Sequence, residues 1–255
     1  MDMYIYLFIS GLFFLPWMCI YGLKKSLRKK MLKTSVIAGF AGFVAEYWYF
    51  KDYWQPSTLM GRSVISIEDF LFGFTITGIG VAVYEFAFSV KTALVYKSRK
   101  KQLGLFFLFG VFFMMVFNIV LGINSIVVSC AAFILFTAAM ISIRPDLLRQ
   151  SLLSGLFTLM VVVPVYALLF NIVSPHYWDD HWLLAKTGMG VTLLGNIPAT
   201  ELVWYFSWGC FAGTAHSFAS GRARVTIPVK NNTAVQPVTA LATEPGAISR
   251  PETAE

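Results

Sequence analysis

Charged residues are scarce in this sequence of 255 residues. Aspartate, glutamate, lysine and arginine together make up 13% of it, whereas hydrophobic residues make up 57%. Soluble domains carry about 25% charged and about 45–50% apolar residues, so this composition excludes an ordinary soluble domain. The charge that is present is mainly positive, with 20 lysines and arginines against 13 acidic residues. The composition indicates a chain that crosses a membrane several times.

Cysteine is rare as well. The three cysteines, Cys19, Cys130 and Cys210, lie in three different apolar segments and at no paired spacing. A disulfide framework or a zinc site needs cysteines in pairs or close clusters, so we expect neither. The three side chains are expected to pack as small hydrophobic groups. No resident cofactor or metal is predicted.

Long apolar runs, in contrast, are abundant. A helix needs about 20 apolar residues to cross a bilayer, and seven runs approach that length: 3–22, 31–50, 66–94, 103–121, 125–143, 151–173 and 198–220. The third run is overlong and is expected to tilt or to extend past the bilayer. We therefore predict an all-α polytopic membrane protein with about seven transmembrane helices.

Basic residues follow alternate apolar runs. The clusters come after the first, third, fifth and seventh runs: Lys24, Lys25, Arg28, Lys29, Lys30 and Lys33; Lys97, Arg99, Lys100 and Lys101; Arg144 and Arg149; Arg222 and Arg224. Because such residues collect in cytoplasmic loops, we expect a cytoplasmic (inner) membrane protein with its N-terminus outside and its C-terminus inside. Attraction to anionic membrane lipid fits the same charge. Nucleic-acid binding is not expected, because aromatic residues do not alternate with the clusters.

The last segment differs in composition from the rest. From residue 225 onward the chain is rich in threonine, alanine and valine and is interrupted by prolines at positions 228, 237, 245 and 251. Such a composition is typical of disordered segments. We predict a transmembrane domain over 1–221 and a disordered cytoplasmic tail over 222–255.

A weak internal repeat relates the third and seventh runs at an offset of 132 residues. The segment "ISIEDFLFGF" then lies over "IPATELVWYF", so that Asp69 matches Glu201 and Phe72 matches Trp204. An aromatic loop precedes both segments, "KDYWQP" in one case and "PHYWDDHW" in the other. The pattern predicts two parallel three-helix repeats, about 1–96 and 125–221, joined by a central helix at about 103–121.

The doubled motif resembles that of the membrane-integral lycopene cyclases, which occur as two small bacterial subunits or as one fused chain. That family carries Pro-x-Glu-(Glu/Asp) before an aromatic run once in each repeat. Here the first copy reads Ser66-Ile67-Glu68-Asp69 and the second Pro198-Ala199-Thr200-Glu201. Ser66 stands where the family has proline, and Thr200 stands where it has an acid. The resemblance spans about 1–221.

The resemblance implies an enzyme of the intramolecular lyase or isomerase type, which closes ionone rings at the ends of a linear carotenoid by acid–base chemistry without redox change. Its substrate would be a lipid-soluble polyene or isoprenoid, and no cofactor is implied. The implied proton-handling residues are Glu68, Asp69 and Glu201. Phe72, Trp204 and Trp208 are implied as walls that stabilise a carbocation through their ring faces. Glu46 is expected to join the same cluster.

Each of these residues also has a structural interpretation. Glu68 and Asp69 fall in the first turn of a helix, where the macrodipole favours acids, and Ser66 is a suitable N-cap. Pro198 suits a first helical position. The aromatic residues would equally form a belt at the membrane interface. Glu85 is expected to be structural, paired with a nearby cation such as Lys91.

Other functions are weaker matches. A retinal protein needs a lysine in its last span, and 198–220 contains none. The segment "HYWDDH" at 176–181 could hold a metal, but an ordinary solvated loop is the expected state. The serious alternative is a non-catalytic relative that binds a carotenoid or another isoprenoid, or packs against another membrane protein, and Thr200 is the residue that favours it. The sequence leaves open whether the chain forms a homo- or hetero-oligomer.

Overall fold

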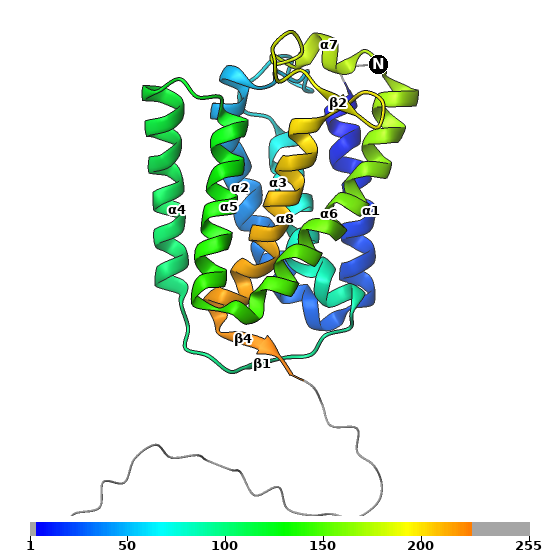
Figure 1. Cartoon of the computed structure of the whole chain (residues 1–255). Helices are drawn as coiled ribbons and strands as arrows, with labels where there is room; N and C mark the ends of the chain where they lie inside the picture. Colours follow the sequence, from blue (N-terminus) through cyan, green and yellow to red (C-terminus); the bar gives the residue numbers. More distant parts are fainter. Residues whose placement is uncertain (1–3, 226–255) are drawn as a thin grey trace, which may run out of the picture. The chain divides into compact units, whose positions relative to one another are not determined.

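The computed structural model describes residues 4–225, and that part of the chain is mostly helical. Its seven long helices pack into one bundle (Figure 1): α1 (Ile5–Leu23), α2 (Arg28–Asp52), α3 (Ile67–Ala87), α4 (Lys100–Met114), α5 (Ser125–Ile143), α6 (Leu148–Leu168) and α8 (Ala199–Ser220). π-helical turns continue two of them, η3 (Met115–Val120) after α4 and η5 (Leu169–Val173) after α6. The predicted all-α membrane fold is confirmed.

Length and apolarity identify five candidate membrane spans in the described part of the chain. They are Ile5–Leu23, Ile67–Ala87, Lys100–Val120, Ser125–Ile143 and Pro145–Val173. The other two long helices have sufficient length but lower apolarity. Helix α2 carries charged residues at both ends, and α8 contains Glu201 and His216. A total of seven membrane crossings therefore stays a prediction.

The prediction of one helix over the third apolar run, 66–94, is wrong at its C-terminal end. Helix α3 ends at Ala87, and two residues later Ser89 has a φ of 49°, which is not helical. Thr92–Leu94 then forms strand β1, which pairs antiparallel with β4 (Arg222–Arg224). Residues 222–224, which were predicted to begin the disordered tail, form strand β4 instead. The predicted disorder of 226–255 lies outside the described residues.

The same order of elements occurs twice along the chain. A short 3₁₀ turn, η2 (Lys25–Leu27) or η4 (Pro145–Leu147), joins α1 to α2 and α5 to α6. A loop and a third long helix follow in each half, and strand β1 or β4 comes after that helix. Two repeats would produce this order, although the repeat itself stays a prediction.

The two ends of the bundle differ in their loops. Strands β1 and β4 lie at one end, together with the basic segments that follow α1, α3, α5 and α8 (Figure 1). The opposite end carries the short helix α7 (Tyr177–His181) and the hairpin of β2 (Thr192–Leu193) and β3 (Ile197–Pro198). The carboxyl groups that begin α3 and α8 belong to this second end.

Arg144, one of the basic residues, stabilises the first end of the bundle through buried contacts. Arg144 is 2% exposed and donates to the backbone oxygens of Ser217 and Arg222, each at 3.0 Å. Its guanidinium lies over the ring of Tyr96, 4.1 Å from the centroid. Arg144 therefore joins the end of α8 to the segment before α4, in addition to contributing positive charge.

Glu85 pairs with a different lysine from the one expected. Its Oε1 lies 2.7 Å from Nζ of Lys30 in α2, and each of the two side chains is 9% exposed. The expected partner was Lys91, which is closer in sequence. Lys30 also donates to the backbone oxygen of Val81 at 2.7 Å, so the pair connects α2 to α3, which satisfies the structural interpretation of Glu85.

Helix α4 packs against α5 and α8 through partly exposed aromatic rings, and polar contacts hold the segment beyond its end. None of the side chains of Lys100–Met114 is buried, whereas Asn118 in η3 is completely buried. The Asn118 amide donates to the carboxylate of Asp52, which ends α2. The hydroxyl of Ser125 donates to the same carboxylate at 2.6 Å. Asp52 thus joins α2 to η3 and to the first residue of α5.

Helices α2 and α3 approach each other closely through two glycines. A Cβ at Gly42 would collide with the backbone oxygen of Asp69, and one at Gly73 would come within 2.5 Å of the backbone oxygen of Ala38. Small residues permit such backbone approach between membrane helices. The contact fixes the position of the first turn of α3.

Replacement of Gly42 by alanine should therefore destabilise the protein. Overpacking of a tight contact costs about 1–3 kcal/mol, so we expect a clear decrease in melting temperature in detergent, followed by tryptophan fluorescence. Gly11→Ala in α1 is the matched control, because a Cβ there meets no atom within 4 Å. Equal melting temperatures for the two variants would contradict the proposed contact.

Candidate functional site: an apolar cavity with three carboxyl groups

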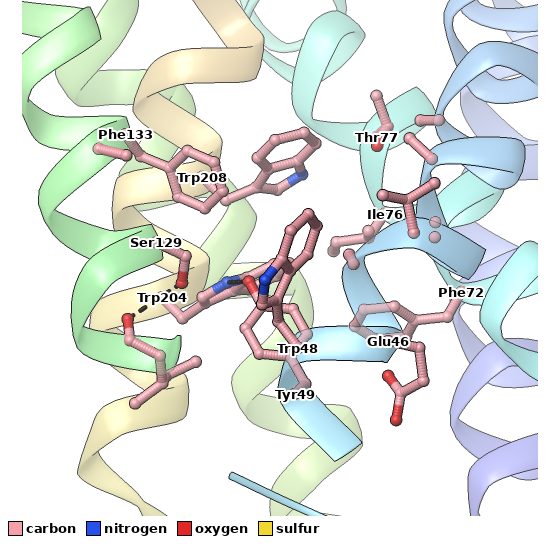
Figure 2. A pocket seen from close by; sticks show the side chains of 18 of the residues that line it. Glu46, Trp48, Tyr49, Phe72, Ile76, Thr77, Ser129, Phe133, Trp204 and Trp208 are labelled. Carbon is pink, nitrogen blue, oxygen red and sulfur yellow. Dashed lines mark hydrogen bonds between the residues drawn. The ribbon is translucent and has the colours of Figure 1, made fainter. Parts of the chain in front are cut away.

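A cavity of about 370 Å³ lies between the helices of the bundle. Residues of α2, α3, α5 and α8 form most of its wall, and α4 contributes one side. The wall is mainly aromatic and aliphatic, but the carboxyl groups of Glu46, Asp69 and Glu201 also line it. Figure 2 shows the rings of Phe72 and Trp204 within this space. An apolar cavity with a few polar groups is typical of a binding site for a hydrophobic molecule.

Asp69 both caps helix α3 and lines the cavity. The backbone N–H of Ser66 donates to its Oδ2 at 2.6 Å, and the backbone N–H of Asp69 donates in return to the Ser66 hydroxyl at 3.4 Å. This reciprocal pair is a capping box. The hydroxyl of Tyr6 in α1 donates to Oδ1 at 2.7 Å. The predicted capping role of Ser66 is confirmed, and Asp69 additionally faces the cavity.

Glu201 accepts hydrogen bonds from two tyrosines. The hydroxyl of Tyr53 donates to Oε1 at 2.6 Å, and that of Tyr166 in α6 donates to Oε2 at 3.0 Å. Tyr166 is also 2.6 Å from the hydroxyl of Tyr205. Helix α8 begins at Ala199, one residue later than expected, so Pro198 is its N-cap residue and not its first helical residue, and no side chain caps it. The two tyrosines therefore position Glu201.

Tyr53 is held in place by two paired loops. Its backbone oxygen accepts a hydrogen bond from the backbone N–H of Leu183 at 2.9 Å. The backbone N–H of Gln55 donates to the backbone oxygen of His181 at 2.8 Å. Burial, together with the nearby Glu201 carboxylate, raises the pKa of Tyr53 well above its usual value. The hydroxyl therefore keeps its proton and remains a donor to Glu201.

Glu68 is not among the residues that line the cavity, in contrast to the expected cluster with Asp69 and Glu201. The side chain is completely buried, and its Oε1 accepts from the backbone N–H of Leu59 at 2.8 Å. Successive residues of a helix point about 100° apart, and here Asp69 faces the cavity whereas Glu68 faces the preceding loop. Glu68 instead fixes the loop before α3.

Thr200 occupies the matching place in the second motif, and it is likewise absent from the cavity wall. Its hydroxyl lies 3.0 Å from that of Tyr53. The motif position that lost its acid therefore corresponds to Glu68, which faces away from the cavity in the first copy. Each motif contributes one carboxyl group to the cavity, Asp69 from the first and Glu201 from the second.

Phe72, Trp204 and Trp208 all line the cavity, as expected. The ring centroids of Phe72 and Trp204 are 6.2 Å apart, and those of Trp204 and Trp208 are 5.9 Å apart in a stacked arrangement. Trp204 is fixed by donation from its indole N–H to the hydroxyl of Tyr49 at 2.8 Å. Figure 2 shows Trp204, Trp208 and Tyr49 together on one side of the cavity.

Sequence reasoning missed the tyrosines that hold the carboxyl groups. Tyr6, Tyr53, Tyr166 and Tyr205 are each no more than 2% exposed. A tyrosine inside an apolar run is a usable signal, because a buried hydroxyl requires a hydrogen-bond partner.

The segment "HYWDDH" also differs from expectation, since it forms α7 with buried Tyr177, Trp178 and His181 instead of a solvated loop. Within residues 4–225, no group of three or more metal-binding side chains is found.

Tyr53→Phe should destabilise the protein, because Glu201 would lose a buried donor. An unsatisfied buried polar group costs about 1–3 kcal/mol, and a lower melting temperature in detergent would reveal it. Tyr47→Phe is the matched control, since Tyr47 lies in α2 and is 60% exposed. If both variants melt like the wild type, the Tyr53 hydroxyl does not support Glu201.

One of three comparisons with known proteins gave a match. The family model described as lycopene cyclase matches two segments, residues 3–87 and 124–219, which together cover more than half of the chain. The first segment contains Glu46 and Asp69, and the second contains Glu201. The search of curated proteins and that of solved structures gave no match. The chain therefore belongs to the lycopene cyclase family, which supports a carotenoid cyclase-like function with a lipid-soluble substrate.

Proposed function

We propose that the chain is a membrane-integral cyclase that closes ionone rings at the ends of a linear carotenoid by acid–base chemistry. The observation that carries the proposal is the cavity itself. It holds one carboxyl group from each copy of the doubled motif beside several aromatic rings, in surroundings that are otherwise apolar. Such surroundings suit a hydrocarbon substrate and keep water away from a reactive cation.

The reaction consists of two proton transfers and one ring closure. A proton adds to the terminal carbon–carbon double bond and leaves a cation on the neighbouring carbon. The electron pair of a second double bond then attacks that cation, which forms the ring bond and moves the charge into the ring. A base removes a proton from a ring carbon to give a new double bond. No net proton is gained or lost, and no redox change occurs.

Asp69 and Glu201 suit the role of base and of counter-charge. Both oxygens of each carboxyl group accept hydrogen bonds from neighbouring groups, which holds the negative form in a fixed orientation. The faces of Phe72, Trp204 and Trp208 would stabilise the cation between the two transfers through their ring quadrupoles. Positioned acid–base groups of this kind contribute about 10²–10⁴-fold to rate.

The alternative is a non-catalytic relative that binds an isoprenoid. The loss of an acid at Thr200 was the feature in its favour, but the matching Glu68 points away from the cavity. Thr200 therefore does not remove a carboxyl group that could meet substrate. This geometry supports the catalytic proposal over the binding-only one.

The direct test is expression of the chain in a lycopene-accumulating bacterium, followed by chromatography of the pigments. We expect monocyclic or bicyclic carotenoids, because the cavity has the size and polarity for one end of a polyene. Unchanged lycopene, with the protein present in the membrane in good yield, would overturn the proposal and favour the binding-only alternative.

Glu201→Gln and Asp69→Asn should each reduce cyclic product by about 100-fold or more per folded protein. Both substitutions keep the side-chain shape and remove the base. Asp180→Asn is the control, since Asp180 is exposed in α7, outside the cavity. Near-normal product from Glu201→Gln and Asp69→Asn would leave both acids with a purely structural role.

A further inference from the structure

Glu46 differs from the other two acids of the cavity. It lies in the second half of α2, is 4% exposed, and lines the cavity. Figure 2 shows its carboxyl group below the ring of Phe72. Its Oε1 is a buried oxygen with no hydrogen-bond partner among the described residues. Buried polar atoms without a partner are rare in proteins and require an explanation.

The groups around Glu46 include two further acids. Asp69 in α3 and Glu201 in α8 both lie within electrostatic range of its carboxyl group, and the indole of Trp54 is placed to donate to it. None of the lysines, arginines and histidines in residues 4–225 forms an ion pair with Glu46. A lone buried charge is costly in apolar surroundings, whereas a neutral carboxyl group with its own proton is tolerated.

A proton donor needs an O–H group that is free to point at substrate. Asp69 and Glu201 do not offer one, because both oxygens of each accept from neighbouring donors. Glu46 retains one unoccupied oxygen. The cavity therefore holds two acids whose oxygens are all hydrogen-bonded and one acid with an unpaired oxygen. Such a difference in environment distinguishes the acid from the base in other carboxylate sites.

We propose that Glu46 is the general acid that starts the cyclisation; this inference rests on the proposed function. The proton moves from the Glu46 carboxyl group to the terminal alkene carbon, and Glu46 becomes a carboxylate. After ring closure, Asp69 or Glu201 takes one proton from a ring carbon. Proton exchange with water between turnovers reprotonates Glu46 and deprotonates the base, so each turnover consumes no net proton.

The position of Glu46 also implies one catalytic site for each chain. It stands outside the doubled motif, and α6, which holds the equivalent place in the second half, contains no acidic residue. A single donor serves the two motif acids of one cavity. The two ends of a carotenoid would therefore react in separate binding events, with a monocyclic carotenoid as the intermediate that leaves the site.

The test compares Glu46→Gln with Glu46→Asp and the wild type in the lycopene-accumulating bacterium. We expect Glu46→Gln to lower cyclic product by about 100-fold or more, and Glu46→Asp to retain at least about a tenth of wild-type product because it keeps a proton. Lycopene that copurifies with the protein should be unchanged in both variants. Loss of copurified lycopene together with product would instead show a role in binding.

Incubation of membranes with unlabelled lycopene in deuterated water marks the carbon that receives the first proton. Wild-type product should carry deuterium at the carbon that receives the first proton, and the small residue of product from Glu201→Gln should carry it too. Substantial labelled product from Glu46→Gln would overturn the assignment of the donor while leaving the cyclase proposal intact. Absence of cyclic product from the wild type would overturn the cyclase proposal itself.

Discussion

The site depends on the need to satisfy carboxyl groups that are buried in an apolar bundle. Each oxygen of Asp69 and Glu201 is paired with a donor, and tyrosine supplies most of these donors. A tyrosine ring packs well among hydrocarbon side chains while its hydroxyl reaches a polar partner. The bond from Tyr53 to Glu201 also crosses between the two halves of the chain. The hydrogen bonds that stabilise the buried acids therefore also connect the two halves of the chain.

Much of the fold could be predicted from composition and charge. Apolar runs marked most long helices, and basic clusters marked the loops at one end. The cap at Ser66 followed from its residue type and from the acids in the first turn of the helix. The end of α3 could not be predicted, because the apolar character continues through the strand that follows it. Arg144 was counted only as loop charge, since its buried contacts with Ser217 and Arg222 are distant in sequence.

The candidate site could be predicted only in part. The doubled motif brought Asp69 and Glu201 together, but it also included Glu68, which points into the preceding loop. A pattern of adjacent acids does not say which one faces a cavity, because helix rotation is set by packing. At Gly42 that packing is a backbone contact between α2 and α3. Glu46 could be assigned to the cluster from the sequence, but its unpaired oxygen could not be predicted, because only three-dimensional contacts reveal a missing partner.

Helix α4 gives the cavity an unusual wall. Phe107, Val111 and Met114 line the cavity, yet no side chain of Lys100–Met114 is fully buried. The helix contacts α5 and α8 through aromatic rings, and Asn118 beyond its end donates to Asp52. In a bilayer, acyl chains would press on one face of this helix and a hydrocarbon ligand on the other. The resting width of the cavity would then depend on lateral pressure and acyl-chain order, so that lipid composition tunes ligand exchange without any change in the buried acids.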